Sequence, residues 1–121
     1  TQLKTIAAAY PDLAPGLEQV MGRFVDLLPI VRKHVYHPDF QGSFSIKSVA
    51  PALSPAASYE GMNNTDGSSA TAAYLHMTDP ANTAQERSGM KSSLLQYCKQ
   101  DTVAMVEIYR RLVEGEVIHN E

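Results

Sequence analysis

Apolar side chains recur every three or four residues from Met90 to Val113, and this pattern constrains the fold more than any other feature of the chain. Such spacing places side chains on one side of an α-helix, where they can pack on a core. We therefore expect a long helix that ends at Gly115, with Cys98 inside as a buried small hydrophobe. The expected inner face consists of Leu94, Leu95, Cys98, Met105, Ile108, Tyr109 and Leu112.

The rest of the chain divides into shorter helical segments between prolines and turn residues. We expect helices over residues 3–10, 13–24, 29–35, 46–53 and 70–77, with a long loop over 56–69. Asp26 is placed to cap the helix from Leu27 onward, and Asp66 or Ser68 to cap the helix over 70–77. The one candidate strand runs from Phe24 to Leu27. The expected fold class is therefore mainly α, with at most one short strand.

Length and charge indicate one modest domain with no bulk affinity for polyanions. The chain has 121 residues, of which 44% are hydrophobic, so we expect a single domain over residues 1–121. The formal net charge is −3. A protein that binds nucleic acid through bulk electrostatics usually carries a basic excess, because phosphate neutralisation supplies most of its non-specific affinity.

Cysteine usage and hydropathy exclude two further classes. A single cysteine forms no intramolecular disulfide and no zinc site of the CxxC type. The apolar runs are only a few residues long, far below the roughly 20 that a membrane-spanning helix needs. The opening residues lack the pattern of a secretory signal, so we expect a cytoplasmic protein with no membrane partner.

Tyr97 and Asp101 are the candidate catalytic pair. They are four residues apart on the expected long helix, so their side chains share one face. A carboxylate there can bind a hard divalent cation, and a tyrosine hydroxyl can orient the water that the metal activates. Equally, Tyr97 can be an amphipathic residue at the edge of a core and Asp101 an exposed helix residue. The YxxxD spacing alone leaves both interpretations open.

Other candidate side chains have simpler interpretations. His34 and His37 form an HxxH pattern, but Pro38 places the second histidine outside the helix, which argues against a metal site there. Three cations can contact a phosphate backbone in a complete domain or can form a solvated helix face. These are Arg32, Lys33 and Lys47.

Two blocks of the chain resemble a known superfamily. The string LLQYCKQDTVAMVEIYRRL, residues 94–112, resembles the third exonuclease motif of the DEDD superfamily, the DnaQ-like 3′-5′ exonucleases with an RNase H-like fold. Its tyrosine subclass has YxxxD on the last helix. Residues 24–53 are similar to the stretch that follows the second motif. Together the blocks are similar to an uncharacterised bacterial family of predicted nucleases, and the resemblance is loose between residues 55 and 90.

The resemblance implies a metal-dependent hydrolase that acts on a DNA or RNA end with two Mg or Mn ions. Asp101 would be one of four metal-binding carboxylates, and Tyr97 would orient the nucleophilic water. The chain departs from the family in that none of its six aspartates has Glu two positions later, so the first motif has no counterpart, and the second-motif aspartate is missing too. The chain therefore corresponds to the helical C-terminal half of an RNase H-like α/β domain.

A two-metal centre needs several carboxylates, so we expect these 121 residues to hold no ions and to have no nuclease activity by themselves. The alternative is a helical interaction module without catalysis. If strands outside this chain normally cover its apolar face, that face is exposed here, and large exposed apolar patches favour association. We therefore expect a homodimer or another homo-oligomer.

Overall fold

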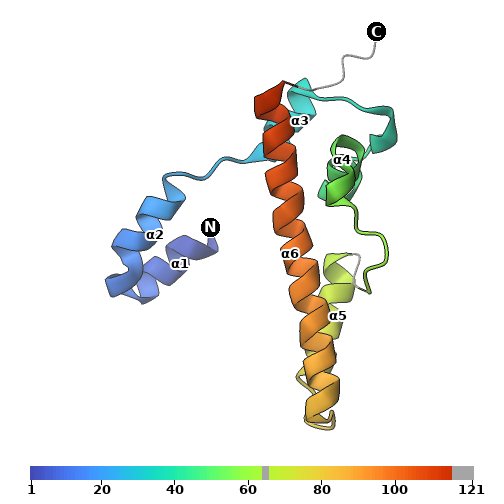
Figure 1. Cartoon of the computed structure of the whole chain (residues 1–121). Helices are drawn as coiled ribbons and strands as arrows, with labels where there is room; N and C mark the ends of the chain where they lie inside the picture. The colour runs from blue at the N-terminus through green and yellow to red at the C-terminus, as the bar shows by residue number, and fades with distance from the viewer. Residues whose placement is uncertain (64–65, 116–121) are drawn as a thin grey trace.

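The computed structural model describes residues 1–63 and 66–115. Within these ranges the chain forms six α-helices and three short 3-10 helices and no β-strand, so the prediction of a mainly α fold is confirmed (Figure 1). In chain order they are α1 (Gln2–Ala9), η1 (Pro11–Leu13), α2 (Ala14–Met21), α3 (Leu27–His34), η2 (Pro38–Phe40), α4 (Ile46–Leu53), η3 (Pro55–Ala57), α5 (Gly67–Met77) and α6 (Ala84–Glu114).

Helix α6 has 31 residues and begins at a capping box. The Glu86 backbone N–H donates to Oγ1 of Thr83, and the Thr83 backbone N–H donates to a carboxylate oxygen of Glu86. This reciprocal pair satisfies donors that a helix start otherwise leaves unpaired. The helix ends at Gly115, which has a φ of 69°. Glycine adopts this left-handed conformation without steric cost, so the predicted C-terminal stop is confirmed.

Helices α3, α4 and α5 lie along α6, and these four helices with the segments that join them are called the main body (Figure 1). Helix α5 lies beside the first half of α6, α4 and η3 lie beside its second half, and α3 lies near its C-terminal end (Figure 1). The buried core forms between α6 and these elements and contains little polar surface. Its members are Leu27, Val31, Val35, Phe40, Val49, Ala50, Ala57, Tyr59, Tyr97, Ala104 and Ile108.

The buried face of α6 differs from the predicted face. Only three residues of α6 are fully buried, namely Tyr97, Ala104 and Ile108. Four residues that we expected inside are exposed, namely Leu95, Cys98, Met105 and Tyr109. The prediction that Cys98 is a buried hydrophobe is therefore wrong. The apolar stripe of α6 is wider than the area that α4, η3 and α5 cover, so part of the stripe faces solvent.

Helices α1 and α2, joined by η1, form a hairpin that lies apart from α6 (Figure 1). None of its helices contains a buried residue. The predicted helix over 13–24 is correct in type, but α2 covers only Ala14–Met21. Its apolar residues do not pack on the core as expected, since Leu13 and Val20 remain exposed. These side chains stay exposed because the hairpin lies apart from the main body (Figure 1).

The prediction of a strand from Phe24 to Leu27 is wrong. Residues 24–26 form an irregular linker, and α3 already begins at Leu27. Asp26 caps this helix as predicted, because its Oδ1 accepts a hydrogen bond from the Leu28 backbone N–H at 3.1 Å. A single strand needs a neighbour for its backbone hydrogen bonds, and the described residues offer none, so the cap determines the conformation.

The helices predicted over 46–53 and 70–77 are also present. Helix α4 covers the predicted residues 46–53 although Pro51 lies inside it. Helix α5 starts three residues earlier than predicted, because Asp66 forms a capping box with Ser69. None of the helices in the described ranges is long and apolar enough to cross a bilayer.

The cap at Asp26 supports a first prediction. Replacing Asp26 with Ala removes the acceptor for the Leu28 N–H, and we expect the free energy of unfolding to fall by about 1 kcal/mol. Urea denaturation followed by circular dichroism measures the change. Asp12→Ala is the matched control, because Asp12 is exposed in η1 and caps no helix with its side chain. Equal stability of the two variants would contradict the role of the cap.

Candidate functional site

Tyr97 and Asp101 lie one turn apart on α6 and both contact Tyr59. The Tyr59 hydroxyl donates a hydrogen bond of 2.7 Å to Oδ1 of Asp101. The Tyr59 and Tyr97 rings lie 6.4 Å apart between centroids. Because one residue touches both, Tyr97 and Asp101 point to the same side of α6, toward the segment after α4. Both tyrosines are buried, and Asp101 is half-buried.

The segment that carries Tyr59 is held to α6 by Gln100. Its Nε2 donates to the backbone carbonyl of Ala56 at 3.2 Å and to that of Ser58 at 2.7 Å. Consecutive residues of α6 therefore bind consecutive parts of one segment, since Gln100 holds its backbone and Asp101 holds the Tyr59 hydroxyl. The position of Tyr59 follows from these contacts and not from regular structure, because it lies after η3.

Lys47 in the first turn of α4 brings a cation to the same cluster. Its Nζ lies 5.3 Å from the centroid of the Tyr97 ring and 5.9 Å from that of Tyr59. An ammonium over the face of a tyrosine ring is attracted by the negative π surface. The pKa of the Asp66 carboxyl is lowered, mainly by the hydrogen bond from the Ser69 backbone, with a smaller contribution from the Lys47 charge.

Burial raises the pKa of the Tyr59 hydroxyl well above its ordinary value, and the hydrogen bond to Asp101 and the charge of that carboxylate add to the effect. Each of these favours the neutral phenol, because a phenolate would be desolvated and would face a negative carboxylate. Tyr59 therefore remains a hydrogen-bond donor to Asp101. We call Lys47, Tyr59, Tyr97 and Asp101 the polar cluster, which combines one ammonium, two phenol groups and one carboxylate.

The donor set of this cluster does not fit a two-cation centre by itself. In the part of the chain that the structure describes, no group of three or more His, Cys, Asp or Glu residues could hold a metal ion. Among Lys47, Tyr59, Tyr97 and Asp101, only Asp101 has a carboxylate, and its Oδ1 already accepts the Tyr59 hydrogen bond. Two cations need several carboxylates in common.

Sequence reasoning missed Tyr59 as part of this site. It lies in the segment that we expected to be a loop, and no spacing rule connects it with Asp101, which is 42 positions away. Within this polar segment the aromatic side chain of Tyr59 stands out, but its presence does not indicate which residue it contacts. Lys47, by contrast, is one of the three cations that the sequence offers either as phosphate contacts or as a solvated helix face, and the structure places its Nζ 5.3 Å from the centroid of the Tyr97 ring.

The other candidate side chains lie away from this cluster or serve helix ends. His34 is the last residue of α3, whereas His37 caps η2, where its Nδ1 accepts from the Asp39 backbone N–H at 3.1 Å. Arg32 and Lys33 are exposed in the last turn of α3.

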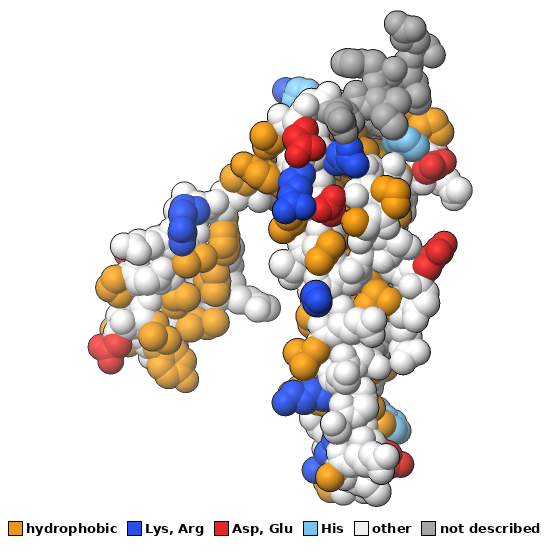
Figure 2. Space-filling view, in the orientation of Figure 1, with side chains coloured by type: hydrophobic (Ala, Val, Ile, Leu, Met, Phe, Trp, Pro, Cys, Tyr) orange, Lys and Arg blue, Asp and Glu red, His pale blue; other side chains and the backbone are white. Residues whose placement is uncertain are grey.

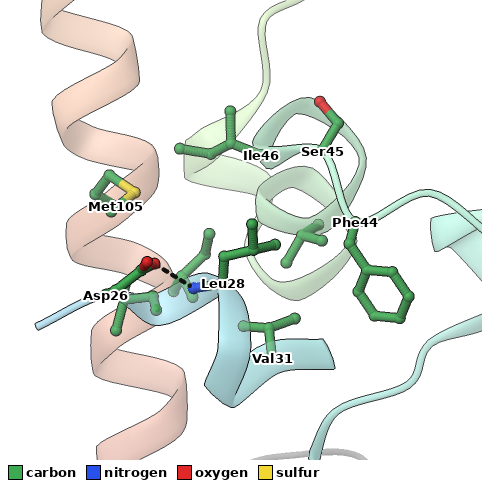
Figure 3. Close-up of a pocket in the computed structure, with 10 residues that line it drawn as sticks. Asp26, Leu28, Val31, Phe44, Ser45, Ile46 and Met105 are labelled. Carbon is green, nitrogen blue, oxygen red and sulfur yellow. Dashed lines mark hydrogen bonds between the residues drawn. The ribbon is translucent and has the colours of Figure 1, made fainter. Parts of the chain in front are cut away.

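A separate apolar groove of about 270 Å³ lies between α3, α4 and α6 (Figure 3). Leu28 and Val31 line it from α3, Ile46 from α4, and Met105 from α6, while the capping bond between Asp26 and Leu28 lies at its edge. Neither Tyr97 nor Asp101 lines this groove. The chain therefore has a polar cluster and an apolar groove at different places along α6.

Comparison with known families finds one match. A family described as a domain of unknown function (DUF2779) matches residues 1–45. This range covers the hairpin, α3 and η2 and ends before Lys47, so it contains none of the residues of the polar cluster. No curated protein and no solved structure matches the chain.

The raised pKa of Tyr59 predicts a pH dependence of stability. The folded chain holds this proton more tightly than the unfolded chain, so the stabilisation is complete below the ordinary tyrosine pKa of about 10 and is lost as the pH rises from there toward the higher folded pKa. We expect the free energy of unfolding to fall more between about pH 9 and about pH 11 in the unmodified chain than in Tyr59→Phe. Urea denaturation at both pH values measures the difference, and an equal fall in the two proteins would contradict it.

Proposed function

We propose that this chain is part of a 3′-5′ exonuclease domain of the DEDD superfamily, tyrosine subclass, that acts on DNA or RNA. The observation that carries the proposal is the shared side of α6 on which Tyr97 and Asp101 contact Tyr59. The resemblance of residues 94–112 to the third motif requires this arrangement of the pair.

In this proposal Asp101 is a metal ligand and Tyr97 orients the attacking water in the complete domain, which uses Mg or Mn. The described residues supply one carboxylate to that centre, so the other ligands come from outside them. Lys47 is the candidate contact to a substrate phosphate, since lysine positions a nucleic-acid backbone without reading its sequence. We propose a cytoplasmic location, where the exposed thiol of Cys98 stays reduced.

Hydrolysis assays test this function in two proteins. The purified 121-residue chain should not degrade labelled single-stranded DNA or RNA with Mg²⁺ or Mn²⁺, because a single carboxylate does not hold two cations. In a longer protein that also contains the first two motifs, Asp101→Ala should lower the rate more than about 100-fold, since loss of groups that merely support a ligand already costs 10–100-fold.

Asp79→Ala in the longer protein is the matched control. Asp79 lies in the connection between α5 and α6, where its carboxylate accepts a hydrogen bond from the Ala81 backbone N–H. Circular dichroism checks that both variants fold. Robust metal-dependent hydrolysis by the 121-residue chain would refute its predicted inactivity. Full activity of a folded Asp101→Ala variant would refute the nuclease function.

The hairpin favours a second candidate function, a non-catalytic interaction module that binds a second copy of this chain. Figure 2 shows hydrophobic side chains gathered on the hairpin beside the main body. The exposed large ones there and in the following linker are Ile6, Tyr10, Leu13, Val20, Phe24 and Val25. A water-soluble monomer rarely leaves so many large apolar side chains together in water.

The total accessible surface supports self-association. The chain exposes 8766 Å², about a third more than the roughly 6,400 Å² expected of a compact monomer of this mass. The hairpin, which lies apart from α6 and contains no buried residue in its helices, contributes to this excess (Figure 1).

Light scattering tests this module. At high micromolar concentration we expect the chain to be a dimer or a larger oligomer, and Leu13→Ser to shift it toward the monomer, because serine removes apolar area from the hairpin. Leu95→Ser is the matched control, since Leu95 is equally apolar and exposed but lies on α6. A monomeric unmodified chain, or equal dissociation by both variants, would contradict an interface on the hairpin.

A further inference from the structure

We infer that Tyr59 is a positioning residue for Asp101, because its hydroxyl binds Oδ1 of the carboxylate and so determines how Asp101 is presented beside Tyr97. The inference rests on the proposed nuclease function, in which Asp101 is the ligand. It assigns a role to a residue outside the two blocks that resemble the superfamily, in the stretch of the chain where the resemblance is loose.

The geometry shows a restrained donor. The Tyr59 side chain is 8% exposed and its hydroxyl lies 2.7 Å from Oδ1. Its ring packs against Tyr97 and under the Lys47 ammonium. Gln100 holds the backbone just before it by two hydrogen bonds. These side-chain contacts of Tyr59 are thus to residues of α4 and α6, the helices that carry the rest of the cluster, and they restrain its hydroxyl.

A free aspartate has two side-chain torsions and samples several orientations. A phenol hydroxyl offers a single proton, so its hydrogen bond engages one carboxylate oxygen and orients the other. Catalytic groups must be held close to their productive geometry, and hydrogen bonds to ligating carboxylates provide this restraint.

The chain contains a comparable bond that serves as a structural control. The Ser54 hydroxyl, also buried, donates to Oε2 of Glu107 at 2.9 Å. This bond likewise ties the segment after α4 to α6, but it acts on a different carboxylate, two turns further along α6. If the Tyr59 bond only anchors this segment, removing either hydroxyl should have the same consequences.

The test compares Tyr59→Phe, Ser54→Ala and Asp101→Asn. In the 121-residue chain, proton NMR should show a slowly exchanging Tyr59 hydroxyl signal that Asp101→Asn shifts and Ser54→Ala retains. In the longer protein, Tyr59→Phe should lower kcat about 10-fold with KM within about 2-fold, because a misplaced carboxylate weakens the chemical step more than substrate binding. Ser54→Ala should leave both constants unchanged.

The outcomes separate the two hypotheses. Loss of hydrolysis in Asp101→Asn with a selective fall of kcat in Tyr59→Phe supports the positioning role. Loss of hydrolysis in Asp101→Asn with equal kcat in Tyr59→Phe and Ser54→Ala overturns the role of Tyr59 and leaves the nuclease function standing. Retained hydrolysis in Asp101→Asn overturns the nuclease function itself. A hydroxyl signal that does not respond to Asp101→Asn overturns the contact on which the inference depends.

Discussion

The packing of short helices along α6 is the constraint on which the main body depends. Helices α3 and α4 have eight residues each, and isolated helices of this length are marginal in water because nucleation costs more than a few hydrogen bonds return. They persist because each buries one face against the core that α6 completes. The capping boxes at Thr83 and Asp66 define where α6 and α5 begin.

The polar cluster is a consequence of this packing. Helix α4 brings Lys47 to α6, and the segment after η3 brings Tyr59, so the pair on α6 gains a cation and a hydrogen-bond donor from two other places in the chain. Burial then alters the chemistry, because it raises the pKa of Tyr59 and keeps the phenol neutral beside the carboxylate. The hairpin is different, since α1 and α2 pack mainly on each other and their apolar residues stay exposed.

The proposed nuclease function and the proposed self-association concern different surfaces, α6 and the hairpin, so self-association through the hairpin is compatible with either proposed function. The family match covers the hairpin and α3 but none of the cluster, whereas the resemblance to the exonuclease motif is carried by α6. If further elements cover the hairpin and complete the proposed metal site, they account both for the exposed apolar side chains of the hairpin and for the single carboxylate of the polar cluster. A second copy of the chain can cover the exposed apolar side chains of the hairpin.

The sequence by itself determined the local features. Helical spacing predicted α6 and its stop at Gly115, Asp26 and Asp66 were recognised as caps, and four-residue spacing placed Tyr97 and Asp101 together, because each of these depends on residues within one or two turns. Only the tertiary structure decided that Cys98 is exposed, that no strand forms at Phe24, and that Tyr59 binds Asp101. Burial depends on what packs against a face and a long-range hydrogen bond on how two distant segments meet, and neither is encoded in the spacing of neighbouring residues.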